Sequence, residues 1–578
     1  MDGTRRTTSG RATAAALAAL GLLASGARAA GPATNPPAPG LLARMLAGPM
    51  AGVEEIVHAE RVGGTDHWYA NFGFYSAPVN EGPPQRAEAG MCEPAIFKDG
   101  GRLCRWNLRT RTRTVLLDDP AGGIRDPAVH PDGRTIVFSW RRGGESAFHL
   151  FEIQSDGTGL RQITRGDYDD IEPAWLPDGG IVFCSARCRR YVNCWRTPVA
   201  VLHRCDRDGG ALRALSSNVE HDNTPWPMPD GRILYMRWEY VDRNQSSYHH
   251  LWTANPDGTG QMVWFGNQFK GYAMLDAKPV PGSRRVVASF SPGHGRPEHM
   301  GHVTLVDPVH GPDRMASARR VSRGDLAYRD PYPFSEDCFL VADGAGIHVM
   351  DGGGRTELVC AAPPGTPALG CHEPRPLAPG PRGPVVASTL DPAAATGRLV
   401  LGDVTFGRGM EGVGRGEIRD LLVFEQLPKP VNFSGGPWPL SDGGTFTLAR
   451  LLGRVPVEPD GSADFEVPAM RSLFFVAVDG RGMSVKRMQS FVTVQPGETL
   501  GCAGCHEART AAPQAGPRGL AHSGRPPRRI EPIPGAPDVF DFPRDIQPIL
   551  DRHCVGCHNP AKPRSEERRV GKECRSRW

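Results

Sequence analysis

The sequence predicts a mainly β protein, made of a six-bladed β-propeller, a small β-sandwich-like domain and a truncated α-helical module. Three observations predict this fold class. A segment with the pattern of "IRDPAVHPDGRTIVFSW", which starts at Ile124, recurs six times; alternating apolar and polar runs follow the last copy; and a short helical pattern starts at Phe542. The abundance of Gly (71 residues) and Pro (55 residues) is typical of short strands joined by turns.

The six copies share a proline anchor, and the anchors lie 43 to 54 residues apart, at Pro127, Pro173, Pro225, Pro279, Pro331 and Pro374. This period is the length of one four-stranded propeller blade. Asp-Gly turns between β-branched and aromatic runs are strong hairpin signals, because Gly accepts the positive φ of a tight turn. We therefore expect six blades over residues 95–405, preceded by an N-terminal segment, 30–94. A β-sandwich is the alternative, although it would need no fixed period.

Residues 406–507 show the pattern of further strands. Stretches such as "LLVFEQLPKPVN" from Leu421 and "RSLFFVAVDGRGMSV" from Arg471 alternate and are broken by turn residues, which predicts the small β-sandwich-like domain. Its last strand runs directly into the sequence "GCAGCHE".

Two C-x-x-C-H motifs carry the chemistry, and they are formed by Cys502, Cys505 and His506 and by Cys554, Cys557 and His558. Two thiols at this spacing can form thioethers with one porphyrin, while the adjacent His binds the iron. A redox dithiol or half of a zinc site is the alternative, but neither explains why His follows directly in both copies. We therefore expect two haem c groups, with iron bound by the two histidines. The candidate distal ligands of the first are Met470, Met483, Met488 and His522.

The second motif ends a different kind of segment. Residues 508–539 are rich in Pro, Gly and Arg, a composition that predicts a flexible linker. Residues 540–563 include "FPRDIQPILDRHCVGCH", which resembles the start of a planctomycete-type cytochrome c domain. Its first helix would place Ile546, Ile549 and Leu550 on one inward face. The haem of this truncated module would exchange electrons with the first.

Both ends of the chain are expected to lie outside the mature protein. Residues 1–29 combine arginines, an apolar run too short for a bilayer and a small-residue cleavage site, which predicts a signal peptide and a periplasmic or otherwise exported protein. Residues 564–578 resemble the translation of a sequencing adapter, so we expect the native protein to be represented only to about Pro563, with the second haem module cut off there. No other stretch is apolar enough to predict a membrane span.

The net charge gives no reason to expect nucleic-acid binding. The formal value is +4, but residues 1–29 and 564–578 each contribute +3, which leaves −2 for the remainder.

Four further cysteines follow one another closely, at Cys184, Cys188, Cys194 and Cys205. In an oxidising compartment they would form disulfides; a zinc site completed by His203 or His506 is the alternative. A separate stretch, "ALGCHEPRP" from Ala368, lacks the first cysteine of a haem motif. Its Glu373-Pro374 falls in register with the repeat anchors, so the repeat explains it without haem.

Three stretches resemble hydrazine synthase alpha subunits: "DHWYANFGFY" from Asp66, "GGRLCRWNLRTRTRTVLLDDPAGG" from Gly100 and "VEHDNTPWPMPDGRILYMRWEYVDR" from Val219. The blade motifs also resemble those of TolB-like propellers. The resemblance runs from about residue 53 to 507 and implies the same fold. In that family the histidine of the catalytic haem motif is understood to turn toward zinc, while a tyrosine shortly after it holds the iron.

This chain departs from that pattern, because the fourth residue after His506 is Thr510 and no tyrosine follows Tyr332. Three functional hypotheses result. The first is an exported di-haem c-type cytochrome that exchanges electrons with a redox protein or a small-molecule donor or acceptor. The second is a hydrazine-synthase-like oxidoreductase at the first haem. The third is a binding protein whose propeller recruits a partner through Trp226, Trp238 and Tyr240, although such aromatic residues more often pack between blades.

Overall fold

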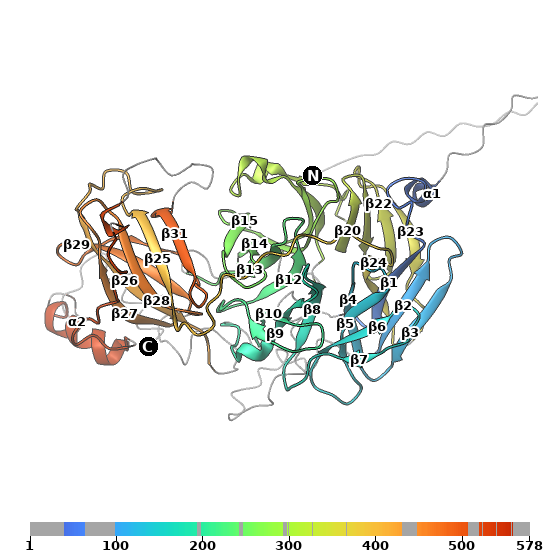
Figure 1. The fold of residues 1–578 in the computed structure, drawn as a ribbon, viewed down its shortest axis with the longest axis horizontal. Helices are drawn as coiled ribbons and strands as arrows, with labels where there is room; N and C mark the ends of the chain where they lie inside the picture. The colour runs from blue at the N-terminus through green and yellow to red at the C-terminus, as the bar shows by residue number, and fades with distance from the viewer. Residues whose placement is uncertain are drawn as a thin grey trace, which may run out of the picture. The chain divides into compact units, whose positions relative to one another are not determined.

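The computed structural model describes residues 40–63, 99–193, 198–241, 247–292, 298, 300–325, 327–365, 367–430, 448–506, 519–522, 524–538, 540–556 and 558. Strands dominate this part of the chain, which confirms the mainly β class (Figure 1). The helical elements are short: α1 (Leu41–Leu46), α2 (Gln547–His553), the 3-10 turns at Ala186–Cys188, Pro308–His310, Met315–Ser317 and Leu520–His522, and a π-helical turn at Phe542–Ile546. Among the described residues, no helix is long and apolar enough to cross a bilayer.

The repeat region forms antiparallel sheets whose strand order follows the chain. One sheet contains β4 (Gly123–Val129), β5 (Thr135–Arg141), β6 (His149–Gln154) and β7 (Arg161–Gln162). The next contains β8 (Asp170–Trp175), β9 (Ile181–Ser185), β10 (Val201–Cys205) and β11 (Arg213–Ala214). A later one contains β20 (Arg329–Ser335), β21 (Cys338–Ala342), β22 (Gly346–Met350) and β23 (Thr356–Ala361).

Between them lies one larger sheet. It contains β12 (Asp222–Pro227), β13 (Ile233–Trp238), β14 (Tyr248–Ala254), β15 (Met262–Phe265), β16 (Tyr272–Pro279), β17 (Val286–Ser291), β18 (His302–Val306) and β19 (Ala318–Arg320). Two repeats are merged here, because β14 pairs with β16 in parallel over two residues.

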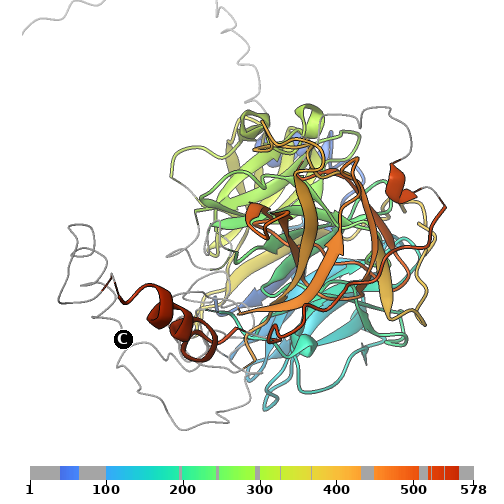
Figure 2. The same ribbon diagram turned by 90° about the vertical axis from the view of Figure 1, so that its left-hand side faces the viewer.

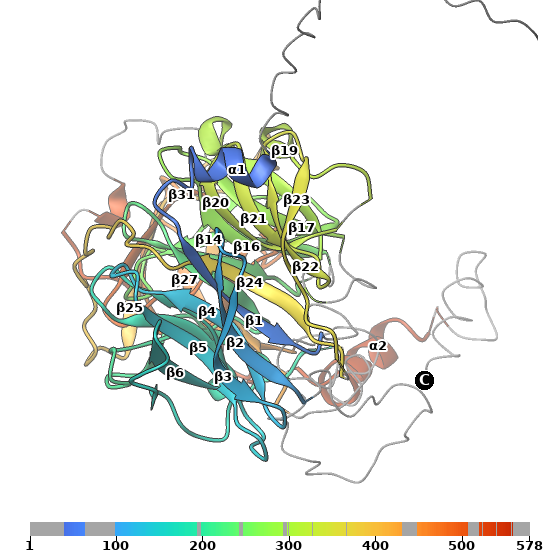
Figure 3. The same cartoon turned by 90° about the vertical axis from the view of Figure 1, so that its right-hand side faces the viewer.

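The beginning and the end of the repeat region meet in a single sheet. β24 (Gly370–Pro376) pairs with β1 (Glu55–Arg61), which continues to β2 (Gly101–Asn107) and β3 (Arg113–Asp119), as Figure 3 shows. The first strands of the repeats, β4, β8, β12, β16, β20 and β24, contact one another in cyclic order. The region is therefore propeller-like; the number of six blades stays a prediction, because the sheets do not separate into six.

Each of these six strands shifts its register at the anchor, where the residue before the anchor has a positive φ. The six residues, with φ between 49° and 56°, are Asp126, Glu172, Thr224, Asp276, Asp330 and Glu373. In the fourth copy the residue with the positive φ is Asp276, so the anchor is Ala277. The prediction from sequence, Pro279, was two residues too late. Lys278-Pro279 imitates the anchor dipeptide, but only the backbone conformation identifies the equivalent position.

Two further sheets form the β-rich domain, shown in orange in Figure 2. One contains β25 (Thr396–Asp403), β28 (Ala463–Pro468) and β31 (Thr499–Gly504); the other contains β26 (Ile418–Leu427), β27 (Leu448–Pro456), β29 (Leu473–Asp479) and β30 (Ser484–Arg487). Both contribute to one apolar core that includes Leu399, Val423 and Phe465. The sequence placed β25 at the end of the propeller, but it pairs with β28 and β31. No strand lies between β24 and β25 to link the two regions.

The expected helix before the second C-x-x-C-H motif is present as α2. The side chain of Ile549, which was expected to point inward, is 54 % exposed to solvent.

Candidate functional site

The first C-x-x-C-H motif lies at the end of β31, an edge strand of the three-stranded sheet in the β-rich domain. β31 pairs in parallel with β25, which places Cys502 opposite Leu401. The next turn packs against residues 406–408: the Cys505 N–H donates to the Phe406 carbonyl oxygen (2.6 Å), and the Arg408 N–H donates to the His506 carbonyl oxygen (3.2 Å). This backbone pairing fixes the path of the motif before any side chain is considered.

Gly407 stands in the middle of that pairing. Its φ is +141°, and a Cβ added there would collide with the Cys505 carbonyl oxygen. A glycine is therefore required for the two segments to approach this closely.

The side chains of the motif are accessible. Cys502 and Cys505 are partly buried, whereas His506 is exposed. Thiols at this spacing can add to the vinyl groups of a porphyrin, and a histidine that follows them directly can serve as an axial ligand. These residues therefore fit a covalently attached haem.

Gln268 and Arg408 orient the imidazole of His506. Arg408 Nη1 donates to Gln268 Oε1 (2.8 Å), and Gln268 Nε2 lies 3.2 Å from His506 Nε2. A guanidinium can only donate, so the amide oxygen of Gln268 faces Arg408 and its NH₂ group faces His506. His506 Nε2 then accepts this hydrogen bond with its single lone pair, so the hydrogen bond would have to open before Nε2 could bind a metal ion.

The second motif is described only in part. Cys554 and His558 follow α2, and the His558 N–H donates to the Cys554 carbonyl oxygen (2.8 Å). Both are at least partly exposed, and Cys557 lies outside the described residues.

The distal-ligand candidates lie in different surroundings. Met483 is 63 % exposed, and Met488 packs against a cluster that contains Phe474 and Phe491. The carbonyl oxygen of Met470 accepts a hydrogen bond from Ser217 Oγ (2.8 Å), and His522 lies 3.7 Å from Asp464. None of these observations marks one of the four candidates as the ligand.

A buried polar cluster joins the propeller strands to the β-rich domain. It lies within the stretch "VEHDNTPWPMPDGRILYMRWEYVDR", and its central residue is Arg237, which is 2 % exposed. Its guanidinium carbon lies 4.1 Å from the centroid of the Trp252 ring and 4.0 Å from that of Phe491, and its Nη2 lies 3.6 Å from Glu239 Oε1. The role of Arg237 was not predicted from the sequence.

Glu220, in the same stretch, is fully buried, and burial raises its pKa to about 8. Its Oε1 accepts a hydrogen bond from the Asn193 N–H (2.9 Å). Because the folded protein binds this proton more tightly than the unfolded chain does, stability should fall as the pH rises from the usual value of 4.5 to about 8.

We expect Glu220→Gln to remove that pH dependence, because the amide has no charge to desolvate. Relative to the variant, the wild-type protein should lose up to about 5 kcal/mol of unfolding free energy between pH 5 and pH 9. Urea unfolding of both proteins at the two pH values measures this difference. A constant difference would show that Glu220 does not titrate in this window.

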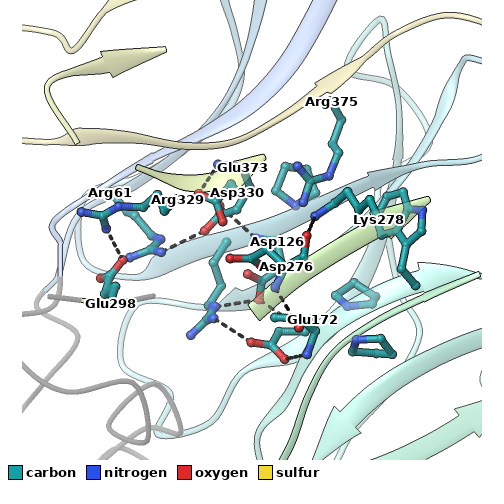
Figure 4. A pocket seen from close by; sticks show the side chains of 16 residues that line it. Arg61, Asp126, Glu172, Asp276, Lys278, Glu298, Arg329, Asp330, Glu373 and Arg375 are labelled. Atoms are coloured by element: carbon teal, nitrogen blue, oxygen red, sulfur yellow. Dashed lines mark hydrogen bonds and ion pairs between the residues drawn. The ribbon is translucent and has the colours of Figure 1, made fainter. Parts of the chain in front are cut away.

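The six positive-φ residues converge on a polar cavity on the propeller axis (Figure 4). The space for centres of water-sized molecules is about 40 Å³, which suits a few waters. Opposite charges alternate around it; for example, Arg61 pairs with both Glu298 (2.6 Å) and Glu373 (2.9 Å). Burial raises the pKa of Glu373 to about 7, and burial together with the neighbouring Arg375 lowers the pKa of Lys278 to about 7.

Hydrogen bonds between successive strands run around this cavity. For five of the six residues, the side chain accepts from the N–H of its equivalent in the next strand. The N–H donors and acceptors are Glu172 to Asp126 (3.0 Å), Thr224 to Glu172 (2.6 Å), Asp276 to Thr224 (3.1 Å), Glu373 to Asp330 (3.0 Å) and Asp126 to Glu373 (3.2 Å). The polar side chains of these five residues are therefore structural acceptors that join neighbouring repeats.

Thr224 offers a test of this role. Thr224→Val keeps the shape of the side chain but removes the acceptor for the Asp276 N–H, so we expect it to lower the unfolding free energy by about 1–3 kcal/mol. Thr224→Asn keeps an acceptor and tolerates the positive φ, so it should be neutral or stabilising. Urea unfolding compares the three proteins. Equal stability of the Val variant and the wild type would contradict the role.

The expected cysteine cluster does not assemble among its described members. Cys184 Sγ donates to the Asp222 carbonyl oxygen (3.1 Å), Cys188 Sγ donates to the Val199 carbonyl oxygen (3.1 Å), and Cys205 packs in a different apolar cluster. None of these three forms a disulfide, and Cys194 lies outside the described residues. His203 Nδ1 lies 3.0 Å from the Val201 carbonyl oxygen rather than facing a metal site. These cysteines are close in sequence, but different strands and sheet faces keep their side chains apart.

The aromatic residues proposed for partner binding are also placed differently. Trp238 and Tyr240 are 1 % and 3 % exposed and pack against each other, so the packing alternative is confirmed for them. Trp226 lines the axial cavity, with Lys278 Nζ 5.1 Å from its ring centroid.

Comparison with known proteins agrees with this architecture. Residues 416–507, which end just after the first C-x-x-C-H motif, match the family described as hydrazine synthase alpha subunit middle domain. Hydrazine synthase subunit alpha of Kuenenia stuttgartiensis is 21 % identical over 81 % of this chain and 76 % of its own length. The solved structure of Kuenenia stuttgartiensis hydrazine synthase superposes with a TM-score of 0.68, at 18 % identity, over 88 % of this chain and 82 % of that chain. TolB from Acinetobacter baumannii is a more distant structure, with a TM-score of 0.35 at 14 % identity over 56 % of this chain and 68 % of that chain. The chain is thus similar to hydrazine synthase alpha subunits over most of its length, it contains a match to their middle domain, and it shares their propeller-like fold.

Proposed function

We propose that the chain is an exported di-haem c-type cytochrome that transfers electrons between a redox partner and a haem on the β-rich domain. The observation that carries this proposal is the arrangement of Cys502, Cys505 and His506 in the first motif. Its backbone is fixed by residues 406–408, its thiols are partly exposed, and the exposed His506 imidazole has an unprotonated Nε2 that would exchange its hydrogen bond from Gln268 for the iron.

The residues of the two motifs would have the following roles. Cys502 and Cys505 would form the thioether bonds, and His506 would be the axial ligand of a haem that supplies one-electron redox chemistry. Cys554, Cys557 and His558 would hold the second haem. Residues 508–539 would tether the two at short range, and a redox protein or a small-molecule donor or acceptor would complete the path.

Haem counting tests the proposal. Protein made in a strain with c-type maturation should carry two covalent haems per chain by pyridine haemochrome and intact mass. The double variant Cys502→Ser, Cys505→Ser should keep one haem, and Cys554→Ser, Cys557→Ser should keep the other. Cys184→Ser, in the propeller, is the matched control and should keep both. A wild-type protein with no covalent haem would overturn the proposal.

A hydrazine-synthase-like oxidoreductase at the first haem is the second candidate. It is favoured by the family match, which includes the first motif, and it is disfavoured by Thr510. Consumption of nitric oxide and ammonium, together with an open iron position by resonance Raman spectroscopy, would support it. A six-coordinate iron with no turnover of these substrates would favour electron transfer alone.

A further inference from the structure

A second group of metal-ligating side chains lies where the propeller region closes, away from both haem motifs. It consists of His58 and Glu60 on β1, Cys104 on β2, Cys360 on β23 and Cys371 on β24. The ligand atoms of His58, Cys360 and Cys371 all lie within 4.8 Å of one another, as do those of His58, Glu60 and Cys104.

Strand register explains why these residues meet. His58 lies opposite Cys104, and Glu60 lies opposite Cys371. Because residues i and i+2 of a strand share a face, all four side chains emerge on one face of the sheet β24-β1-β2-β3. Cys360, from the neighbouring sheet, completes the group, and Arg113 Nη2 donates to its sulfur at 3.5 Å.

The group is enclosed and contains an atom without a partner. His58 and Cys371 are 0 % exposed, and Cys360 is 1 % exposed. Nε2 of His58 lies 3.2 Å from Glu60 Oε1, whereas its buried Nδ1 has no hydrogen-bond partner. Leaving a buried imidazole nitrogen in this way is unfavourable unless something binds it.

Glu60 is placed where it can orient His58 as a metal ligand. A metal-binding histidine commonly donates its second ring N–H to a carboxylate, which fixes the tautomer and strengthens the bond to the metal. Glu60 can accept from His58 Nε2 in this way, and it is itself held by Arg113 Nε at 2.7 Å.

From this geometry we propose that His58 Nδ1, Cys360 Sγ and Cys371 Sγ bind a thiophilic divalent cation, with zinc as the ion that one imidazole and two thiolates favour. Cys104, directly opposite His58, is the nearest further sulfur for a fourth ligand. The ion would cross-link the strand that begins the propeller region, β1, to the two strands that end it, β23 and β24. This site is independent of haem attachment, so its test and that of the proposed function fail separately.

Zinc K-edge X-ray absorption of the purified full-length protein tests the proposal without a variant. We expect about one zinc per chain with two or three sulfur ligands near 2.3 Å and a nitrogen ligand near 2.0 Å. A zinc site with only nitrogen and oxygen ligands, or protein without zinc, would overturn it. An intact mass 2 Da below that of the reduced chain, mapped to a Cys360–Cys371 disulfide, would also overturn it.

Variants add a second measurement. Cys360→Ser and Cys371→Ser should each reduce bound zinc at least tenfold after dialysis against a weak chelator. Cys338→Ser is the matched control, because Cys338 is an equally buried cysteine of the neighbouring sheet that does not belong to the group. Equal zinc content in all three variants and the wild type would contradict the assignment.

Discussion

Arg237→Ala is expected to lower the free energy of unfolding by about 3–5 kcal/mol. The guanidinium is almost completely buried between the rings of Trp252 and Phe491, and it lies 3.6 Å from the buried carboxylate of Glu239. Truncation removes both ring contacts and takes a positive charge away from a carboxylate that is out of water. Because Phe491 belongs to the β-rich domain and Trp252 to the propeller strands, the variant should also weaken their coupling.

Differential scanning calorimetry of the haem-loaded protein measures both effects. We expect a lower Tm and a separation of one transition into two. Arg237→Lys retains the charge but not the planar stacking, so it should fall between the wild type and Arg237→Ala. Arg481→Ala is the control, since the Arg481 side chain is 86 % exposed and should contribute less than about 0.5 kcal/mol. Equal losses of unfolding free energy in the two alanine variants would show that the buried Arg237 stabilises the fold no more than an exposed arginine does.

Gly407→Ala should abolish haem attachment at the first motif while leaving the second intact. The new Cβ would collide with the Cys505 carbonyl oxygen, and the hydrogen bonds from Cys505 to Phe406 and from Arg408 to His506 would have to open. The haem count per chain should therefore fall from two to one, with the loss mapped to the peptide that contains Cys502.

Gly412→Ala is the matched control. Its φ is also positive (+86°), but nothing lies within 4 Å of the added Cβ, so it should cost only about 1 kcal/mol of backbone strain and keep both haems. Two covalent haems in Gly407→Ala would show that the close approach of residues 406–408 is not needed for attachment.

The strand-rich fold and the two C-x-x-C-H motifs could be predicted from sequence, because both depend on local spacing. The anchor at Pro279 was wrong by two residues, since the positive φ that defines the anchor is a property of the folded strand and not of one dipeptide. The same locality explains the other errors. Cys184 and Cys205 are close in sequence but lie in different apolar clusters, whereas His58 meets Cys371 only because the distant strands β1 and β24 pair in one sheet.

Because β1 pairs with β24, the first strand of the propeller region has no partner on one side until the last strand has been synthesised. Ile56 finds its partner only when Pro376 has been made, a separation of roughly 300 residues that favours slow folding through late, long-range contacts. Until then one edge of β1 offers unpaired N–H and C=O groups to any neighbouring chain. Synthesis that stops before Gly370 should therefore yield a product that aggregates rather than a smaller stable domain.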